Sequence, residues 1–271
     1  MDNASASAVE PAVLTTRDGA VLTATMNRPA RLNAFNTAMH EGLANAVAEA
    51  RDDKSVRVFV LTGAGRAFSA GQDLSDRTMG EDDAPPDLGH TLDTRYNPLV
   101  RSIRALPIPT VAAINGVAAG AALNIALTCD IAVASRSAAF LQPFANLGLI
   151  PDAGGTFTLP RLVGLGRARA LALLAEKIDA DTAERWGLVY KVFDDDAFAS
   201  ETAKITTRLA SLPTDGLAAI KRAFDEAETN SLNAQLDAER DTQRIAGRHP
   251  DYREGVSAFV EKRKPNFIGR S

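Results

Sequence analysis

The sequence predicts an α/β fold of stacked strands and helices, followed by a helical C-terminal region. Up to about residue 166, apolar β-branched runs alternate with glycine-rich turns and helical patterns, an order typical of α/β domains. From residue 167 on, helical patterns dominate. The apolar stripes of residues 201–271 need a partner surface, which either the core or another subunit would supply.

Length and composition narrow the possible classes of protein. The 271 residues are 45% hydrophobic and 24% charged, which is typical of a soluble globular domain, with or without an appendage. The formal net charge of −4 gives no indication of nucleic-acid binding. No apolar run reaches the roughly 20 residues of a membrane helix. We therefore expect neither nucleic acid nor a membrane as a partner.

The lone cysteine, Cys129, excludes an internal disulfide and fits a reducing compartment. Its place at an apolar helix end indicates a buried structural thiol. Residues 1–7 lack a basic and an apolar region, so no signal peptide is expected and the predicted location is cytoplasmic. Cys129 and the three histidines show no zinc-ligand spacing, so no metal site is predicted.

Three regions are expected along the chain: a disordered tail (1–8), a core that would carry the functional site (9–200) and a helical region (201–271). The core should begin with a hairpin over 13–26 and a helix capped by Asn36 or Thr37. The elements expected after these are a buried strand (56–61), a glycine-rich turn (63–73), a mobile surface loop (77–93), a helix (99–106), a strand (110–114), a Gly/Ala-rich turn (115–122) entering a helix that ends at 129, a strand (131–134), helices (167–175, 182–186), a short strand (189–192), and helices (197–212, 214–228, 232–246, 251–262).

Two turns that follow predicted strands could carry chemistry. The first, 62–74, admits three interpretations. It is a poor dinucleotide loop because Phe68 stands where the third glycine belongs. It could be a nucleophile elbow with Ser69, for which His249 is the only late histidine. It could also point backbone N–H groups into a pocket, as an oxyanion hole does.

The second turn, 115–124, opens a helix, and a helix start has unpaired N–H donors suited to a developing negative charge. Its small residues would leave that helix end uncovered, although close helix packing explains them equally well. Asp152 is a lone carboxylate among apolar and small residues. Burial there would raise its pKa and make it a better base, whereas its ordinary use would be as an N-cap or turn residue.

Together these three segments provide what enolate chemistry requires. Two N–H donors hold a carbonyl oxygen as charge moves onto it, and a carboxylate removes a proton from the neighbouring carbon. Losing one such donor typically costs about 2.7–4 kcal/mol of transition-state stabilisation.

Several motifs, in order along nearly the whole chain, resemble those of the enoyl-CoA hydratase/isomerase (crotonase) family. They are Asn27–Pro29 with Leu32–Ala34, Gly65–Leu74, Pro109–Asp130, Leu147–Pro160 and Phe259–Phe267. The resemblance implies a spiral of ββα units with a C-terminal helical region used in trimerisation. It implies an acyl-CoA thioester as substrate, with coenzyme A as part of that substrate and no separate cofactor. The implied assembly is a homotrimer or a dimer of trimers.

The resemblance also implies roles for individual residues. The backbone N–H groups of Ala70 and Ala121 would hold the thioester oxygen. Lys262 matches a position that often reaches the coenzyme A of a neighbouring subunit. The other positions implied in substrate or coenzyme A binding are Arg28, Arg31, Arg66, Phe68, Gly71, Gln72, Asp73, Leu74, Gly120, Asn124 and Phe144.

Departures from the family pattern favour one activity. Asn124 and Phe144 stand where hydratases of the family carry two glutamates, and neither can act as a general base. Asp152 falls where dienoyl-CoA isomerases carry an active aspartate. The blocks 147–155, 227–230 and 251–259 especially resemble ring-1,2-epoxyphenylacetyl-CoA isomerases, the members that act in phenylacetate catabolism.

The resulting prediction is an acyl-CoA isomerase with Asp152 as the acid/base, which moves a double bond or opens a ring epoxide. Phe144, Leu149 and Ile150 would keep water out, and Asn124 would either orient the acyl group or serve packing. The alternatives are a hydratase that uses Asp152 with water, a serine hydrolase that uses Ser69, and a catalytically silent coenzyme A-binding protein.

Overall fold

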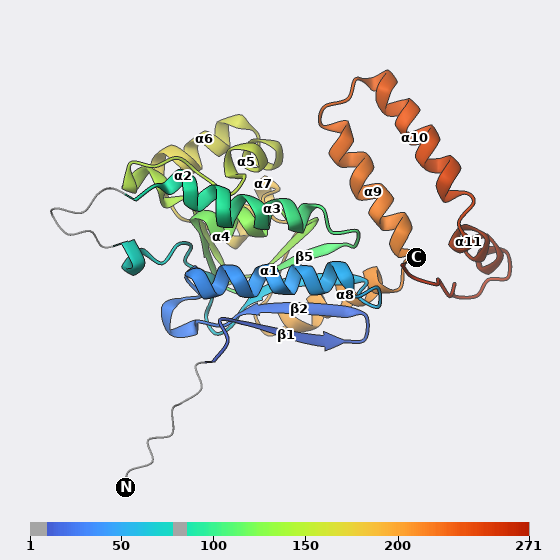
Figure 1. Cartoon of the computed structure of the whole chain (residues 1–271), viewed down its shortest axis with the longest axis horizontal. Coiled ribbons are helices and arrows are strands. Elements are labelled where there is room, and N and C mark those ends of the chain that lie inside the picture. Colours follow the sequence, from blue (N-terminus) through green and yellow to red (C-terminus); the bar gives the residue numbers. More distant parts are fainter. Residues whose placement is uncertain (1–9, 78–85, 271) are drawn as a thin grey trace, which may run out of the picture.

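The computed structural model describes residues 10–77 and 86–270, so the tail expected over 1–8 lies outside the described residues. Two sheets and the helices around them form the body of the molecule (Figure 1). In the described residues the larger sheet has six strands, ordered β1 (Val13–Asp18), β2 (Val21–Met26), β3 (Val58–Gly63), β5 (Thr110–Ile114), β7 (Ile131–Ser135), β10 (Lys191–Phe193). The predicted hairpin is confirmed as antiparallel β1–β2, and the other neighbours are parallel.

A second sheet of four short strands within the described residues was not predicted. Its order is β4 (Ala67–Ser69), β6 (Val117–Ala119), β8 (Ala139–Leu141), β9 (Ile178–Asp179). The prediction of plain turns over 63–73 and 115–122 is therefore wrong in part. Strands of three residues or fewer fall below the length at which a strand pattern is recognisable.

Close turns join the two sheets. In each of the units β3–β4, β5–β6 and β7–β8, the first strand lies in the larger sheet, the second lies in the smaller sheet, and helical structure follows. Glycine is required where the chain crosses over. A Cβ on Gly63 would lie 2.4 Å from the Ala67 carbonyl oxygen, and one on Gly116 would lie 2.2 Å from that of Arg66. The expected ββα spiral is thereby confirmed.

The helices cover both sheets. They are α1 (Thr37–Asp52), α2 (Leu88–Thr91), the π-helical turn η3 (Leu92–Tyr96), α3 (Asn97–Arg104), α4 (Gly120–Ala126), α5 (Gly155–Val163), α6 (Leu165–Leu174), α7 (Ala180–Trp186), α8 (Phe198–Ala210), α9 (Thr214–Ala227), α10 (Leu232–Ala246) and α11 (Pro250–Val260), with short 3₁₀ turns η1 (Pro29–Arg31), η2 (Leu74–Arg77) and η4 (Pro143–Leu147). Asn36 caps α1 as predicted, because its side chain accepts a hydrogen bond from the Met39 N–H at 2.9 Å.

The surface loop predicted over 77–93 is wrong for residues 88–93, which are helical, while residues 78–85 lie outside the described residues. Helix α5 was missed because glycines and a proline interrupt its pattern. Strand β10 begins two residues later than predicted.

The C-terminal helices divide into two groups. Helix α8 packs on the larger sheet, where Phe198, Ile205 and Leu209 cover a cluster of valines. Helices α9–α11 extend away from the body, and α9 and α10 lie side by side (Figure 1). Many of their large apolar side chains are exposed, with Phe224 at 74% and Phe259 at 85%. Within the described residues, no helix combines the length and apolarity needed to cross a membrane.

Candidate active site

The two strand-end turns and the Asp152 segment meet at one cavity of about 300 Å³. This convergence agrees with the prediction from sequence. The described residues that line it are Ala70, Gly71, Gln72, Leu74, Leu88, Leu92, Tyr96, Gly120, Ala121, Pro143, Phe144, Leu147, Leu149, Ile150, Pro151 and Asp152. Asp152 is the only carboxylate in this described lining, and most of the other side chains are apolar.

The two turns touch directly behind the cavity. Gly71 has φ +87°, and a Cβ there would lie 2.9 Å from the Ala119 carbonyl oxygen and 3.9 Å from the Ala121 nitrogen. A side chain would force the turns apart, so glycine is required at this position.

Not every backbone N–H of the first turn can serve a ligand. The Ala70 N–H donates to the Leu32 carbonyl at 2.9 Å, and the Gly71 N–H donates to Ser69 Oγ at 3.2 Å. The Gln72 N–H makes no hydrogen bond to any described residue. The predicted donor at Ala70 is thus already used by the protein's own backbone, and the geometry favours Gln72.

The second turn leads into a helix start as predicted, and the donor role of Ala121 there remains a prediction. Ala121 is the second residue of α4, so its N–H has no carbonyl one turn back within the helix. Every residue of α4 is buried, and Ala121 and Gly120 line the cavity.

Asp152 precedes a tight turn in which two successive residues adopt left-handed backbone angles. Ala153 has φ +48° and Gly154 has φ +83°. The left-handed conformation costs a non-glycine residue about 1–2 kcal/mol, so surrounding contacts must hold this turn. Gly154, not Asp152, is the N-cap of α5. The alternative use of the Asp152 side chain as an N-cap is therefore wrong.

Asn124 provides one of those contacts. Its side chain is completely buried, and its Nδ2 donates to the Asp152 carbonyl at 2.8 Å. The Gly155 N–H donates to the same carbonyl at 2.8 Å. Asn124 is not among the residues that line the cavity, which favours the packing alternative over contact with the acyl group.

Asp73 is engaged in ion pairs and hydrogen bonds with Arg28, Arg31 and Ser75, a structural cluster termed the Asp73 brace. It is 4% exposed; its Oδ2 accepts from Arg28 at 3.0 Å, and its Oδ1 accepts from Arg31 at 3.0 Å and from Ser75 Oγ at 2.6 Å. The Ser75 hydroxyl, then the two guanidinium groups, hold the pKa of Asp73 well below its usual range. Arg28 and Arg31, expected at coenzyme A, are thus first engaged with Asp73.

The remaining predicted positions are distributed differently. The Phe68 side chain is completely buried in the core, so only its backbone is available to a ligand, and its role in binding remains a prediction. Phe144 is 7% exposed and forms part of the cavity wall. Arg66 is exposed near the first turn, and Lys262 is exposed just beyond the end of α11. A role for either in binding remains a prediction.

The serine hydrolase alternative finds no support in the geometry. The Ser69 side chain is fully buried and its hydroxyl donates to the Asn33 carbonyl at 2.8 Å. His249 is the N-cap of α11, among the C-terminal helices α9–α11, and lies between Asp215 and Asp251. Cys129 is buried as predicted, and burial raises the pKa of its thiol to about 12.

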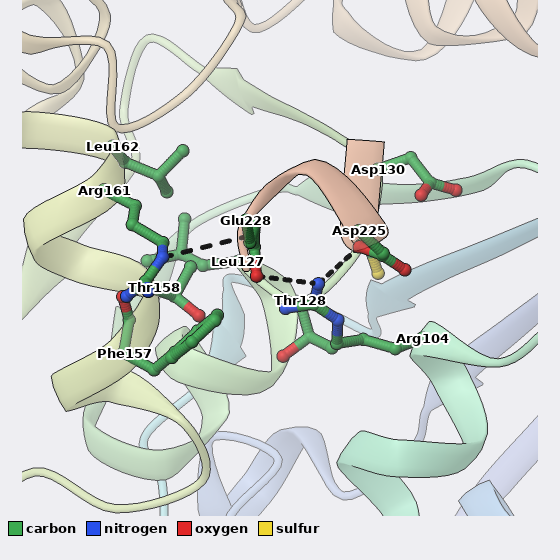
Figure 2. A pocket seen from close by; sticks show the side chains of 11 residues that line it. Arg104, Leu127, Thr128, Asp130, Phe157, Thr158, Arg161, Leu162, Asp225 and Glu228 are labelled. Atoms are coloured by element: carbon green, nitrogen blue, oxygen red, sulfur yellow. Dashed lines mark hydrogen bonds and ion pairs between the residues drawn. The ribbon is translucent and has the colours of Figure 1, made fainter. Parts of the chain in front are cut away.

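A second cavity, of about 180 Å³, lies where α9 meets the body (Figure 2). Arg104 pairs with Asp225 and, at 3.7 Å, with Glu228, which also faces Arg161 at 3.9 Å. The Arg161 guanidinium stacks over the Phe157 ring at 3.5 Å from its centroid. These charges neutralise one another, which indicates a structural junction and not a site for charged ligands.

Sequence reasoning missed the wall formed by Leu88, Leu92 and Tyr96. Leu88 and Leu92 lie in the segment 77–93 that was predicted as a surface loop, Tyr96 lies just beyond it, and none of the three was assigned a role. The Tyr96 hydroxyl donates to Gln72 Oε1 at 2.8 Å. The leucine pair at helical spacing was the available signal, and the expectation of a polar loop obscured it.

Comparison with known proteins agrees with this geometry. The family model described as enoyl-CoA hydratase/isomerase matches residues 16–270. The 1,2-epoxyphenylacetyl-CoA isomerase of Escherichia coli (strain K12) is 51% identical over 92% of this chain and 95% of its own. The 2,3-dehydroadipyl-CoA hydratase of the same organism is 37% identical over 95% of this chain and 99% of its own. A crystal structure of enoyl-CoA hydratase from Bacillus anthracis matches with a TM-score of 0.89 and 31% identity, covering 96% of this chain and 100% of that chain. The chain belongs to the enoyl-CoA hydratase/isomerase family.

Proposed function

We propose that this protein is an acyl-CoA isomerase that moves a double bond, or opens a ring epoxide, through a thioester enolate. One observation carries the proposal. Asp152 is the only carboxylate in the described lining of an apolar cavity that Gln72 and Ala121, the residues whose backbone N–H groups would be the donors, also line. A single base next to two donors is sufficient for proton transfer between two carbons.

The proposed reaction consumes no water. For a 3-enoyl thioester, the Asp152 carboxylate takes a proton from the carbon next to the carbonyl, and the electron pair moves onto the thioester oxygen. The carboxylic acid then returns the proton to the fourth carbon, and the double bond becomes conjugated with the carbonyl. The thioester bond remains intact throughout.

The oxygen that gains charge would be held by the N–H groups of Gln72 and Ala121. Gln72 replaces Ala70 in this proposal because the Ala70 N–H is hydrogen-bonded to Leu32. Each donor of this kind is worth about 2.7–4 kcal/mol in the transition state. Ala121 adds the positive end of the α4 dipole.

The cavity wall favours proton transfer over hydration. Phe144 occupies a position where a glutamate would hold the water that hydratases add, and its ring is buried in the wall. Leu149 and Ile150 are 41% and 78% exposed, so they would exclude water only once a bound acyl group covers the mouth. Hydration with Asp152 as base is the second candidate, because relatives named as hydratases match over nearly the whole chain.

Absorbance of the conjugated thioester tests the proposal with three substrates: a 3-enoyl-CoA, a 2-enoyl-CoA and 1,2-epoxyphenylacetyl-CoA. We expect absorbance to rise with the first and stay constant with the second, or the third to be converted. Loss of absorbance from the 2-enoyl substrate would indicate hydration. No conversion of any of them would favour a silent binding protein.

We further propose that α9–α11 mediate a homotrimer or a dimer of trimers. The support is their exposed apolar side chains, among them Phe224, Leu232, Ile245 and Phe259, which a monomer leaves in water. Sedimentation equilibrium measures the mass, and a monomer at micromolar concentration would contradict this proposal.

A further inference from the structure

We propose that Asn124 is a positioning residue that sets the orientation of Asp152 through the Asp152 backbone, and that Gln142 aligns Asn124 for this role. The inference rests on the proposed function, because it assigns a role towards the proposed base. It differs from the expectation that Asn124 orients the acyl group, since Asn124 has no surface in the cavity.

The hydrogen bonds run in one direction. Gln142 Nε2 donates to Asn124 Oδ1 at 2.7 Å, and Asn124 Nδ2 donates to the Asp152 carbonyl at 2.8 Å. Because the first bond holds the Asn124 oxygen, the NH₂ group must face Asp152. Both side chains are completely buried, so water does not compete for these bonds.

Asn124 also links the proposed base, Asp152, to the proposed donor, the Ala121 N–H, through helix α4. It lies on α4 three residues after Ala121, one helical turn from the proposed N–H donor. The whole helix is buried, so its two ends cannot move independently. The position of Asp152 relative to the thioester oxygen is therefore fixed by one short rigid element.

The surroundings leave Asn124 no alternative position. A Cβ on Gly155 would lie 2.3 Å from Asn124 Nδ2 and 2.6 Å from its Cγ, so the start of α5 is packed against the amide. The intervening Ala153 and Gly154 have left-handed backbone angles, which external contacts must maintain. Without the amide, this turn can relax and the Asp152 side chain rotates with it.

The first test is the variant Asn124→Leu, which keeps the number and branching of the side-chain heavy atoms and removes both hydrogen bonds. We expect kcat for isomerisation to fall about 100-fold, the effect of displacing a catalytic group by about 1 Å, with KM unchanged. Thr128→Val is the matched control. It removes a hydrogen bond from Thr128 Oγ1, just past the end of α4, to the Asn124 backbone carbonyl at 3.0 Å, and should leave kcat unchanged because both Asn124 side-chain hydrogen bonds remain.

A second variant, Asn124→Asp, provides a readout that a purely structural role would not give. A buried carboxylate facing the Asp152 segment would raise the pKa of Asp152, so the acidic limb of the kcat profile should move to higher pH. Tyr96 is the only other titratable side chain in the described cavity lining. If Asn124→Leu does not fold, Gln142→Met removes only the aligning bond and should lower kcat about 10-fold, a tenth of the full displacement effect.

A double variant with Asp152→Asn separates the possible outcomes. If Asn124 acts through Asp152, Asn124→Leu will have no further effect on kcat in the Asp152→Asn background. Full activity of Asp152→Asn alone would overturn the proposed function. An inactive Asp152→Asn together with a folded, fully active Asn124→Leu would overturn only the positioning role. Equal losses from Asn124→Leu and Thr128→Val would overturn it as well.

Discussion

The turn after β4 and the segment before α5 both line the same cavity and each carries an aspartate, but the two carboxylates have different surroundings. Asp73 is buried, with two guanidinium groups and a hydroxyl on its oxygens. Asp152 is half-buried in a lining of leucine, isoleucine, proline and phenylalanine. The side chains around each turn therefore suit Asp73 to a structural role and Asp152 to the proposed acid–base role.

The physical reason is proton affinity. The Ser75 hydroxyl and the guanidinium groups of Arg31 and Arg28 keep the pKa of Asp73 low, so its side chain remains an anion and is a weak base. Apolar surroundings disfavour the anion and strengthen the base. We therefore expect that replacing Asp152 with an amide will lower turnover, whereas replacing Asp73 with an amide will lower stability.

The largest expected effect is on turnover in Asp152→Asn. An amide cannot take the proton, so we expect kcat to fall about 1,000-fold, within the range typical of general acid–base groups. Thermal stability and binding of a CoA thioester, followed by calorimetry, should stay as in the unchanged protein. Retention of more than a tenth of the activity would break the comparison, because the two aspartates would then not differ in role.

The next effect in size is on stability in Asp73→Asn. It weakens charge-assisted hydrogen bonds to Arg28, Arg31 and Ser75, which should lower the free energy of unfolding by about 2 kcal/mol. Urea denaturation measures this loss. The folded variant should keep kcat within a factor of a few, because no proton moves through Asp73. A 1,000-fold loss of kcat with unchanged stability would reverse the two assignments.

Acid should weaken the Asp73 brace. The folded-state pKa of Asp73 lies below its unfolded value of about 3.9, so its stabilisation is complete above that pH. It is lost as the pH falls from about 4 through the lower folded-state pKa. Between pH 7 and pH 3 the difference in unfolding free energy between the unchanged protein and Asp73→Asn should shrink by about 1 kcal/mol. A difference that grows towards pH 3 would show that another group dominates.

Much of this arrangement was predictable because it depends on local patterns. The hairpin, the Asn36 cap and the meeting of three segments at one cavity follow from periodicity, capping chemistry and motif order. The second sheet was not predictable because its strands are too short to show a pattern. Ala70 pairs with Leu32, and Asp73 pairs with Arg28 and Arg31 as well as with its neighbour Ser75. Leu32 and both arginines lie more than thirty residues away, so only tertiary packing brings them to these positions.

The smallest expected effect is on stability in a variant of Arg31, the more exposed of the two arginines paired with Asp73. Arg31 is 53% exposed, against 21% for Arg28, so its pair with Asp73 is screened and should contribute at most about 1 kcal/mol. Arg31→Gln should therefore change the unfolding free energy by less than Asp73→Asn does.

The same exposure leaves the Arg31 guanidinium accessible to phosphate, as the family resemblance implies for coenzyme A. We expect KM for CoA thioesters to rise in Arg31→Gln with kcat unchanged, and more strongly at low ionic strength. An unchanged KM would restrict Arg31 to the brace and leave coenzyme A recognition to other cations, such as the exposed Arg66.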